Sequence, residues 1–137
     1  MLAAMGGEHP NAGLARRVWQ AISEGDVELL AGELLAPDVV WRAHGDNPLA
    51  VEVKGPDQVL ERLARLGENV DEIHMSLLQV YANDDGAVLW SRTHAERGPK
   101  VLDGDVLVHM RIADGRVARV SAVPVDQRRS DEFWRLE

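Results

Sequence analysis

The sequence contains no cysteine, which excludes disulfide bonds and thiolate metal ligands. Positive charge is scarce, because 15 Lys and Arg stand against 23 Asp and Glu and give a net charge of −8. The basic residues never form a run of more than two, whereas nucleic acids and anionic membranes are bound by clustered positive charge. No apolar stretch approaches the roughly 18 residues that cross a membrane. We therefore expect neither a nucleic-acid partner nor a membrane partner.

Apolar residues make up 45% of the 137 residues, which is enough for one domain with its own core. The first ten residues lack the basic segment and the long apolar run of a signal peptide. We expect a flexible tail over residues 1–10 and a single domain over residues 11–137. The whole is expected to be a soluble cytoplasmic protein.

Three segments in the first half have the spacing of helices. From Asn11, apolar residues recur about every fourth position as far as Gly25, a residue that favours a helix end. Asp26 is a good N-cap for a second helix, which stops before the next proline. Pro56 suits the first turn of a third helix. The apolar stripe of this third helix is Val59, Leu60, Leu63 and Leu66.

After Asp71 the apolar period changes from helical to two, which is typical of strands. Four long strands are predicted at residues 72–82, 87–96, 101–112 and 116–125. Turn sequences separate them, and a shorter strand is predicted at residues 38–43. A short helix is expected near the C-terminus. Helices followed by a meander of antiparallel strands indicate an α+β fold.

Several short motifs in this order resemble the nuclear transport factor 2-like superfamily, and especially its SnoaL-like branch. They are "EGD" at 24–26, "LLAPDVVW" at 34–41, "GDNPLAVEVKGPDQVLERL" at 45–63, "DGRV" at 114–117 and "DEFW" at 131–134. The resemblance covers about residues 11–134. It implies a cone-shaped α+β barrel, in which three N-terminal helices pack on a strongly curved, mostly antiparallel sheet around an apolar pocket. It also implies a homodimer formed through the outer sheet face.

The same resemblance implies which side chains face the pocket. "RTH" at 92–94 matches an inward-pointing Arg-x-Asp pair of related epoxide hydrolases, so Trp90, Arg92 and His94 are expected to point inward. Other positions expected to line the pocket are Val18, Val39, Trp41, Ala43, His44, Val106, Val108, Met110, Val120 and Ala122. The outer face is expected to carry Arg42, Asp105, Leu107, His109, Arg111, Val117, Arg119 and Val123.

The pocket positions that match the family's catalytic carboxylates hold apolar residues here. Related steroid isomerases have an acidic base where Ala43 stands and a second acid where Val108 stands. The pair that is left is His94, as a neutral general base, and Arg92, as the partner of an oxyanion or a carboxylate. The alternative is that Arg92 pairs with Glu96 or another acid at the rim and His94 is an ordinary wall residue.

Two functions from different classes follow from these residues. The first is a protein whose apolar pocket binds a lipophilic small molecule without chemistry. The second is a cofactor-independent isomerase, cyclase or hydrolase that uses His94 and Arg92. His44 with Asp46 is a further candidate acid–base pair, although turn chemistry also explains this segment. No metal and no cofactor are expected, because the histidines lie in separate segments without the spacing of metal ligands.

Overall fold

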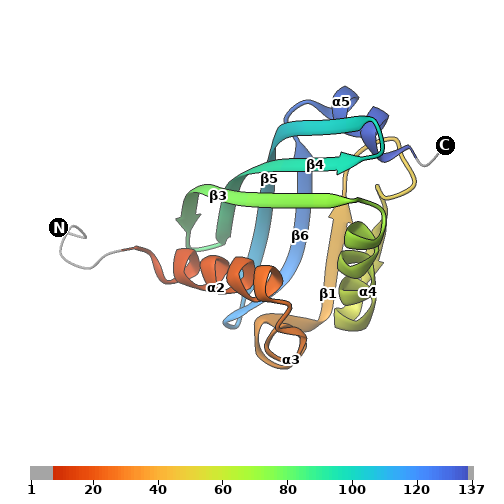
Figure 1. Cartoon of the computed structure of the whole chain (residues 1–137). Coiled ribbons are helices and arrows are strands. Elements are labelled where there is room, and N and C mark those ends of the chain that lie inside the picture. The colour runs from red at the N-terminus through yellow and green to blue at the C-terminus, as the bar shows by residue number, and fades with distance from the viewer. Residues whose placement is uncertain (1–7, 136–137) are drawn as a thin grey trace.

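The computed structural model describes residues 8–135, and it confirms the α+β fold (Figure 1). The helices are α2 (Pro10–Glu24), α3 (Val27–Leu29), the π-helix η1 (Leu30–Leu34), α4 (Gly55–Glu68) and α5 (Gln127–Trp134). The strands are β1 (Leu35–Ala43), β2 (Glu52–Lys54), β3 (Glu72–Asn83), β4 (Gly86–Arg97), β5 (Lys100–Ala113) and β6 (Arg116–Pro124). No helix in residues 8–135 is both long enough and apolar enough to cross a membrane.

Helix α2 has a defined cap at each end. The His9 ring accepts a hydrogen bond from the Asn11 N–H, and Pro10 occupies the first turn. At the other end, Gly25 adopts the left-handed conformation (φ 68°) that lets its N–H reach the carbonyls of Ala21 and Ile22. Residues 1–7 of the predicted tail lie outside the described residues. Of the remaining three, Pro10 belongs to the helix and His9 is its N-cap.

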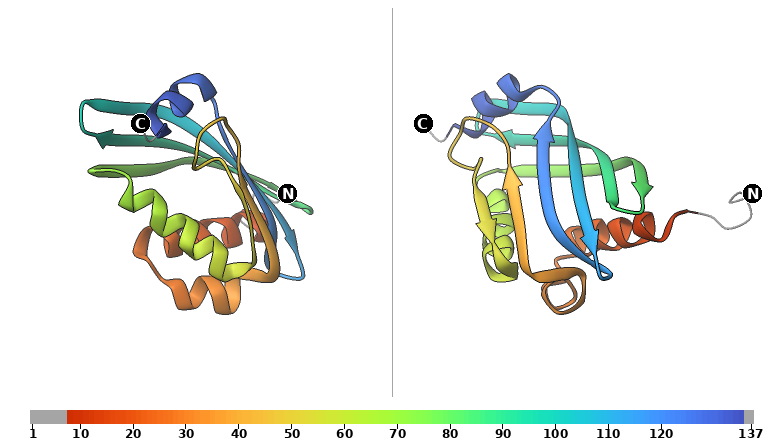
Figure 2. Two further views of the ribbon diagram at one scale, coloured as in Figure 1. Left: turned by 90° about the vertical axis from the view of Figure 1, so that its right-hand side faces the viewer. Right: turned by 180° about the vertical axis from the view of Figure 1, so that it is seen from behind.

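The six strands form one curved sheet in the order β2-β1-β6-β5-β4-β3. All neighbours pair antiparallel except β1 and β6, which are parallel. The sheet does not close, since β2 and β3 are edge strands. Helices α2 and α4 lie on the same side of it (Figure 2), so one face of the sheet is covered and the other is open. The short strand β2 falls in the connection that the sequence indicated as a turn-rich loop.

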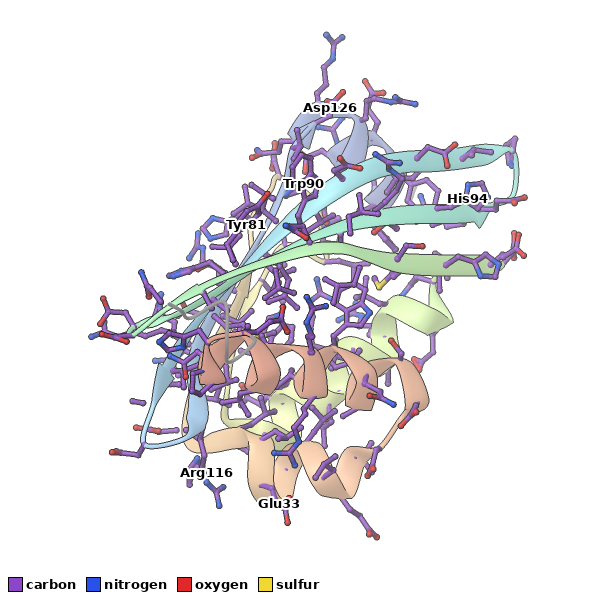
Figure 3. The ribbon with its side chains drawn as sticks, turned by 90° about the vertical axis from the view of Figure 1, so that its left-hand side faces the viewer. Glu33, Tyr81, Trp90, His94, Arg116 and Asp126 are labelled. Atoms are coloured by element: carbon purple, nitrogen blue, oxygen red, sulfur yellow. The ribbon has the colours of Figure 1, made fainter. Side chains whose placement is uncertain are left out.

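The side-chain alternation of β4 is the reverse of the prediction. The odd-numbered residues Leu89, Ser91, Thr93 and Ala95 are all buried, with at most 4% of each exposed. Arg92 is instead 61% exposed, and Trp90 is 38% exposed on the side of the sheet away from the helices (Figure 3). The expectation that Trp90, Arg92 and His94 face the pocket is therefore wrong. Side chains alternate strictly between the two faces of a strand. A shift of one residue in the alignment with the related proteins therefore assigns all three side chains to the opposite face.

A second correction concerns β6. Val117 was expected on the outer face, but it is fully buried together with Val120. The pairing of β5 with β6 shifts between Arg111 and Ile112, so residues on either side of the irregularity follow different alternations. The other predicted outer-face residues on β5, including Leu107 and His109, are exposed or half-buried.

Two apolar clusters hold the fold together. The larger one lies between the sheet, α2, η1 and α4, and Val18, Val39 and Val120 belong to it with no exposed surface. The smaller one consists of Leu49, Ala95, Leu102, Phe133 and Trp134. It attaches α5, the short helix that was predicted near the C-terminus, to the ends of β4 and β5. Between the two clusters the inner sheet face is left unfilled.

Candidate functional site

A cavity of about 170 Å³ lies on the inner face of the sheet. Its walls come from α2, α4, α5, from strands β1, β3, β4, β5 and β6, and from the loop after β1. The aliphatic and aromatic lining residues are Trp19, Ile22, Trp41, Ala43, Leu49, Ala50, Leu63, Leu66, Met75, Leu102, Val106, Val108, Met110, Ala122, Pro124 and Trp134. The polar ones are Ser23, His44, Asn47, Arg62, Ser91, Thr93 and Ser130. Among the described residues, the lining therefore contains no carboxylate, and three of the chain's four tryptophans line the cavity.

Most of the predicted wall residues reach this cavity. Trp41, Ala43, His44, Val106, Val108, Met110 and Ala122 all line it. Val18, Val39 and Val120 do not, because they pack inside the larger apolar cluster behind the wall. On β4, the wall is made by Ser91 and Thr93 in place of the predicted neighbours. The Ser91 hydroxyl donates a hydrogen bond to the Val106 carbonyl at 2.9 Å, which allows a polar side chain inside the sheet.

Arg62 on α4 is the cationic side chain of the cavity wall. Its Nε and Nη1 atoms are buried and have no hydrogen-bond partner within residues 8–135. Burial and, to a lesser extent, the neighbouring Arg65 lower the pKa of the Arg62 guanidinium. An arginine nevertheless stays charged at neutral pH. The site thus presents a positive charge, and two of its three guanidinium nitrogens find no acceptor among the described residues.

The loop between β1 and β2 is fastened over the cavity by Asp131. One Asp131 carboxylate oxygen accepts hydrogen bonds from the Asp46 backbone N–H and the Asn47 side chain, both at 2.8 Å. Burial opposes the charge, but these hydrogen bonds hold the pKa of the Asp131 carboxyl below its usual range. Gly45 is required in this arrangement, since a Cβ there would lie 2.6 Å from the same oxygen. Asp46 takes part in this anchor through its backbone N–H, and it is not among the residues that line the cavity.

Arg92 lies on the outer face and is paired with Asp105. The Arg92 Nε donates to one carboxylate oxygen at 2.9 Å, and the Trp90 indole N–H donates to the other at 2.8 Å. The hydrogen bond from Arg92, followed by that from Trp90, lowers the pKa of Asp105. The alternative prediction placed Arg92 with an acid at the pocket rim; the structure gives it an acid partner, Asp105, but on the outer face and away from the cavity.

His94 is held between two carboxylates on the same outer face. Its Nδ1 lies 2.6 Å from Asp103 and its Nε2 lies 2.9 Å from Glu96. Hydrogen bonds to Glu96 and then to Asp103 raise the pKa of His94 to about 9. The imidazole therefore carries a proton at neutral pH, with both ring nitrogens donating. A protonated ring on the open face is not the neutral base that the sequence suggested.

The described residues contain one group with the spacing of metal ligands. Glu72, His94 and Glu96 each bring one ligand atom within 4.8 Å of the others. The sequence did not predict this, because the group depends on the pairing of β3 with β4, which sets Glu72 opposite Glu96. A metal ion would have to displace the proton of His94, so at neutral pH these side chains are an ion-pair network.

A model of a known protein family matches most of the chain. The SnoaL-like domain model matches residues 15–120. The chain belongs to the SnoaL-like family. The resemblance drawn from the short motifs is thereby confirmed, and this SnoaL-like chain can be set beside its relatives.

Rv0034, an uncharacterised protein of Mycobacterium tuberculosis, is 32% identical over 123 residues, which cover 88% of this chain and 93% of that protein. Bal32a, from a soil-derived mobile gene cassette, is 30% identical with a TM-score of 0.85, over 92% of this chain and 97% of its own. TerC, which was co-crystallised with polyporic acid, has a TM-score of 0.77 over 91% of this chain and 98% of its own. At 18% identity, TerC shares the fold alone.

Sequence reasoning missed Arg62, although the sequence holds a signal for it. Arg62 lies three residues after Val59 and four before Leu66, so it falls on the apolar stripe of α4 rather than on its polar face. A charged residue in such a stripe often extends its end to solvent, and the sequence does not separate that case from a buried one. Trp19 and Trp134 were not predicted as wall residues. Each lies on a helix whose place beside the cavity depends on contacts between distant segments of the chain.

Proposed function

We propose that this SnoaL-like protein binds a small, mostly apolar organic molecule in the cavity on the inner sheet face. The observation that carries the proposal is the cavity itself, which is walled by aliphatic residues and three tryptophans and has few polar groups. Small-molecule sites are concave and mainly apolar, with a small number of placed polar groups. TerC, a protein of the same fold, was co-crystallised with polyporic acid.

The size of the cavity limits the ligand. A cavity of roughly 150 Å³ in another protein accommodates benzene, and the cavity here measures about 170 Å³. A ligand with one six-membered ring and a short substituent therefore matches the space, whereas drug-sized ligands occupy about 300 Å³ or more. The flat faces of Trp19, Trp41 and Trp134 favour a planar ring.

Binding is favoured over catalysis by what the cavity wall contains. Buried carboxylates are a common proton-transfer device in apolar pockets, and the described lining has none. The lining holds one imidazole, that of His44. The enzymatic alternative requires Arg92 and His94 in the cavity, and both side chains lie on the outer face instead. The predicted cytoplasmic location stays a prediction.

The test uses the tryptophans of the cavity. In a Trp90→Phe background, the three remaining tryptophans all line the cavity, so intrinsic fluorescence reports binding there. Toluene is expected to quench or shift this fluorescence saturably. Ala122→Phe fills the cavity and is expected to abolish the response. Val123→Phe, at the next residue on the open face, is expected to preserve it. Equal responses in the two variants would contradict the proposal.

We also propose that the protein forms a homodimer through its open sheet face. Trp90, Leu107 and Val123 lie side by side on β4, β5 and β6 and are 38%, 38% and 39% exposed. Asp103 lies four residues before Leu107 on the same face, and Arg111 lies four after it. A twofold axis crossing β5 at Leu107, at right angles to the strand, would place each Asp103 opposite the Arg111 of the other copy.

Sedimentation velocity at micromolar concentration tests the dimer. Leu107→Glu puts two like charges together at the axis and is expected to yield monomers. Val27→Glu, at an exposed position on α3, is expected to leave the dimer intact. A monomeric wild-type protein would remove this second proposal without affecting the first.

A further inference from the structure

The charge in the cavity is not balanced by any described lining residue. Arg62 lines the cavity with two buried nitrogens that have no hydrogen-bond partner in residues 8–135, and no Asp or Glu is among the described lining residues. The contrast with Arg92 is direct, because that guanidinium lies 2.9 Å from the Asp105 carboxylate on the open face. Buried polar groups in native proteins are nearly always paired, so an exception calls for a partner that the chain itself does not supply.

From this arrangement we infer that the ligand is an organic monoacid, whose carboxylate pairs with Arg62 while its ring lies against the tryptophans. The inference rests on the proposed function, since it assigns the chemical class of the molecule in the same cavity. A ligand of this class supplies both missing elements at once, acceptors for the unpartnered N–H groups and a negative charge opposite the guanidinium.

The charge of the wall decides between a carboxylate and other acceptors. Arg62 is the one Lys or Arg side chain among the described lining residues, so the wall offers a single positive charge. A carboxylate of charge −1 neutralises it. A phosphate of charge near −2 would leave an unpaired negative charge in an apolar site, which is costly. A neutral carbonyl or amide would accept a hydrogen bond but would leave the guanidinium charge uncompensated.

The other polar groups of the cavity wall fit a ligand that has one polar end and an apolar body. Loop residues His44 and Asn47 lie at the wall where the loop after β1 closes, and Ser91 is already used by the Val106 carbonyl. On the β5 and β6 side, the wall is Val106, Val108, Met110 and Ala122. This side offers the ring a surface without hydrogen-bonding side chains.

The experiment compares two probes of nearly equal shape, benzoate and benzamide, at pH 7. Dissociation constants are measured by tryptophan fluorescence in the Trp90→Phe background and by calorimetry. We expect benzoate to bind about tenfold or more tightly than benzamide, because both can accept a hydrogen bond from Arg62 but only the acid brings a negative charge to the guanidinium. Arg62→Met is expected to bring the ratio of the two constants close to one while benzamide binding is kept. Arg62→Lys is expected to retain part of the preference.

Arg65→Met is the matched control, since Arg65 lies on the same helix, is exposed and does not line the cavity. It is expected to keep the full preference for benzoate. Equal binding of the two probes by the wild type would overturn the inference and leave the proposed function standing. A preference that survives in Arg62→Met would overturn it as well. Failure of both probes and of toluene to bind would instead remove the proposed function, and the inference with it.

Discussion

Arg62 in the cavity and Arg92 on the open face carry the same charge in two different surroundings. Arg92 is 61% exposed and is held by Asp105, with Trp90 bound to the second oxygen of that carboxylate. Arg62 has two buried nitrogens that no described residue partners. Exposed ion pairs add little to stability, whereas an unpaired buried polar group is destabilising. The arginine that is unfavourable for folding is the one that we place in the ligand site.

The same contrast holds for the titratable groups of the two faces. On the open face, His94 lies between Glu96 and Asp103 at 2.9 and 2.6 Å, and Glu72 lies 2.9 Å from His74. The inner face has no carboxylate in its described lining. Charged groups that pair with one another within the protein do not require a ligand. The candidate site therefore differs from the open face in whether its charged groups have partners within the protein. The chemical type of those groups does not distinguish the two places.

The largest expected effect concerns which face of β4 is buried. Leu89→Ala removes a side chain with no exposed surface from the larger apolar cluster and is expected to lower the free energy of unfolding by about 3 kcal/mol. Arg92→Ala, on the same strand but on the opposite face, is expected to lower it by less than about 1 kcal/mol. Urea denaturation of both variants gives the comparison. A larger loss for Arg92→Ala would mean that the faces are assigned the wrong way round.

The sequence of β4 left this assignment undecided. One face carries Leu89, Ser91, Thr93 and Ala95, and the other begins with a tryptophan, so both are mixtures of apolar and polar residues. Alternation showed that a strand is present, but not which face is buried. Burial of Ser91 depends on a hydrogen bond to β5, which only the register of the folded sheet provides. Transfer of an inward Arg from distant relatives therefore put Arg92 on the wrong side.

Other parts of the fold follow directly from the residues. The apolar stripe of α4 and the glycine that ends α2 sit where the spacing indicated, because helix periods and left-handed caps are local properties. The wall from Trp41 to Ala43 was also predicted, since the alternation of β1 is unambiguous there. The β5–β6 irregularity and the buried state of Arg62 were not predictable, because both depend on contacts between distant segments.

A second prediction contrasts two aspartates. Asp131→Ala leaves the Asp46 N–H and the Asn47 amide without their acceptor, and we expect a loss of about 2 kcal/mol in the free energy of unfolding at pH 7. Asp103→Ala, on the open face, is expected to change it by no more than about 0.5 kcal/mol. Thermal unfolding followed by circular dichroism measures both. Equal losses would show that the loop after β1 is not anchored by Asp131.

A third prediction exchanges the two arginines for methionine. Arg62→Met removes a half-buried guanidinium whose Nε and Nη1 have no partner within residues 8–135 and keeps an unbranched apolar side chain, so the ligand-free protein is expected to gain about 1 kcal/mol. This corresponds to an increase of about 4 °C in the midpoint of thermal unfolding. Arg92→Met is expected to leave the midpoint unchanged or slightly lower. A fall in the midpoint of Arg62→Met would contradict the view that Arg62 serves binding rather than folding.

The smallest effect is the pH dependence contributed by His94. Its pKa in the folded protein is raised to about 9 from an ordinary value of 6.5, so folding favours the protonated ring. The stabilisation is therefore complete below about pH 6.5 and is lost as the pH rises through 9. We expect the midpoint of thermal unfolding to decline over this range less steeply in His94→Gln than in the wild type. Because the network is exposed, 1 M salt should largely remove the difference.

The central claim is that the inner face of the sheet, and not the outer one, holds the ligand. A crystal of the protein soaked with 4-bromobenzoate tests it, because the anomalous signal of bromine locates the ring without interpretation of weak density. The account predicts the bromine inside the cavity walled by Trp19, Trp41 and Trp134, with the carboxylate on Arg62. Bromine on the open face beside Arg92 or His94, with an empty cavity, would contradict it.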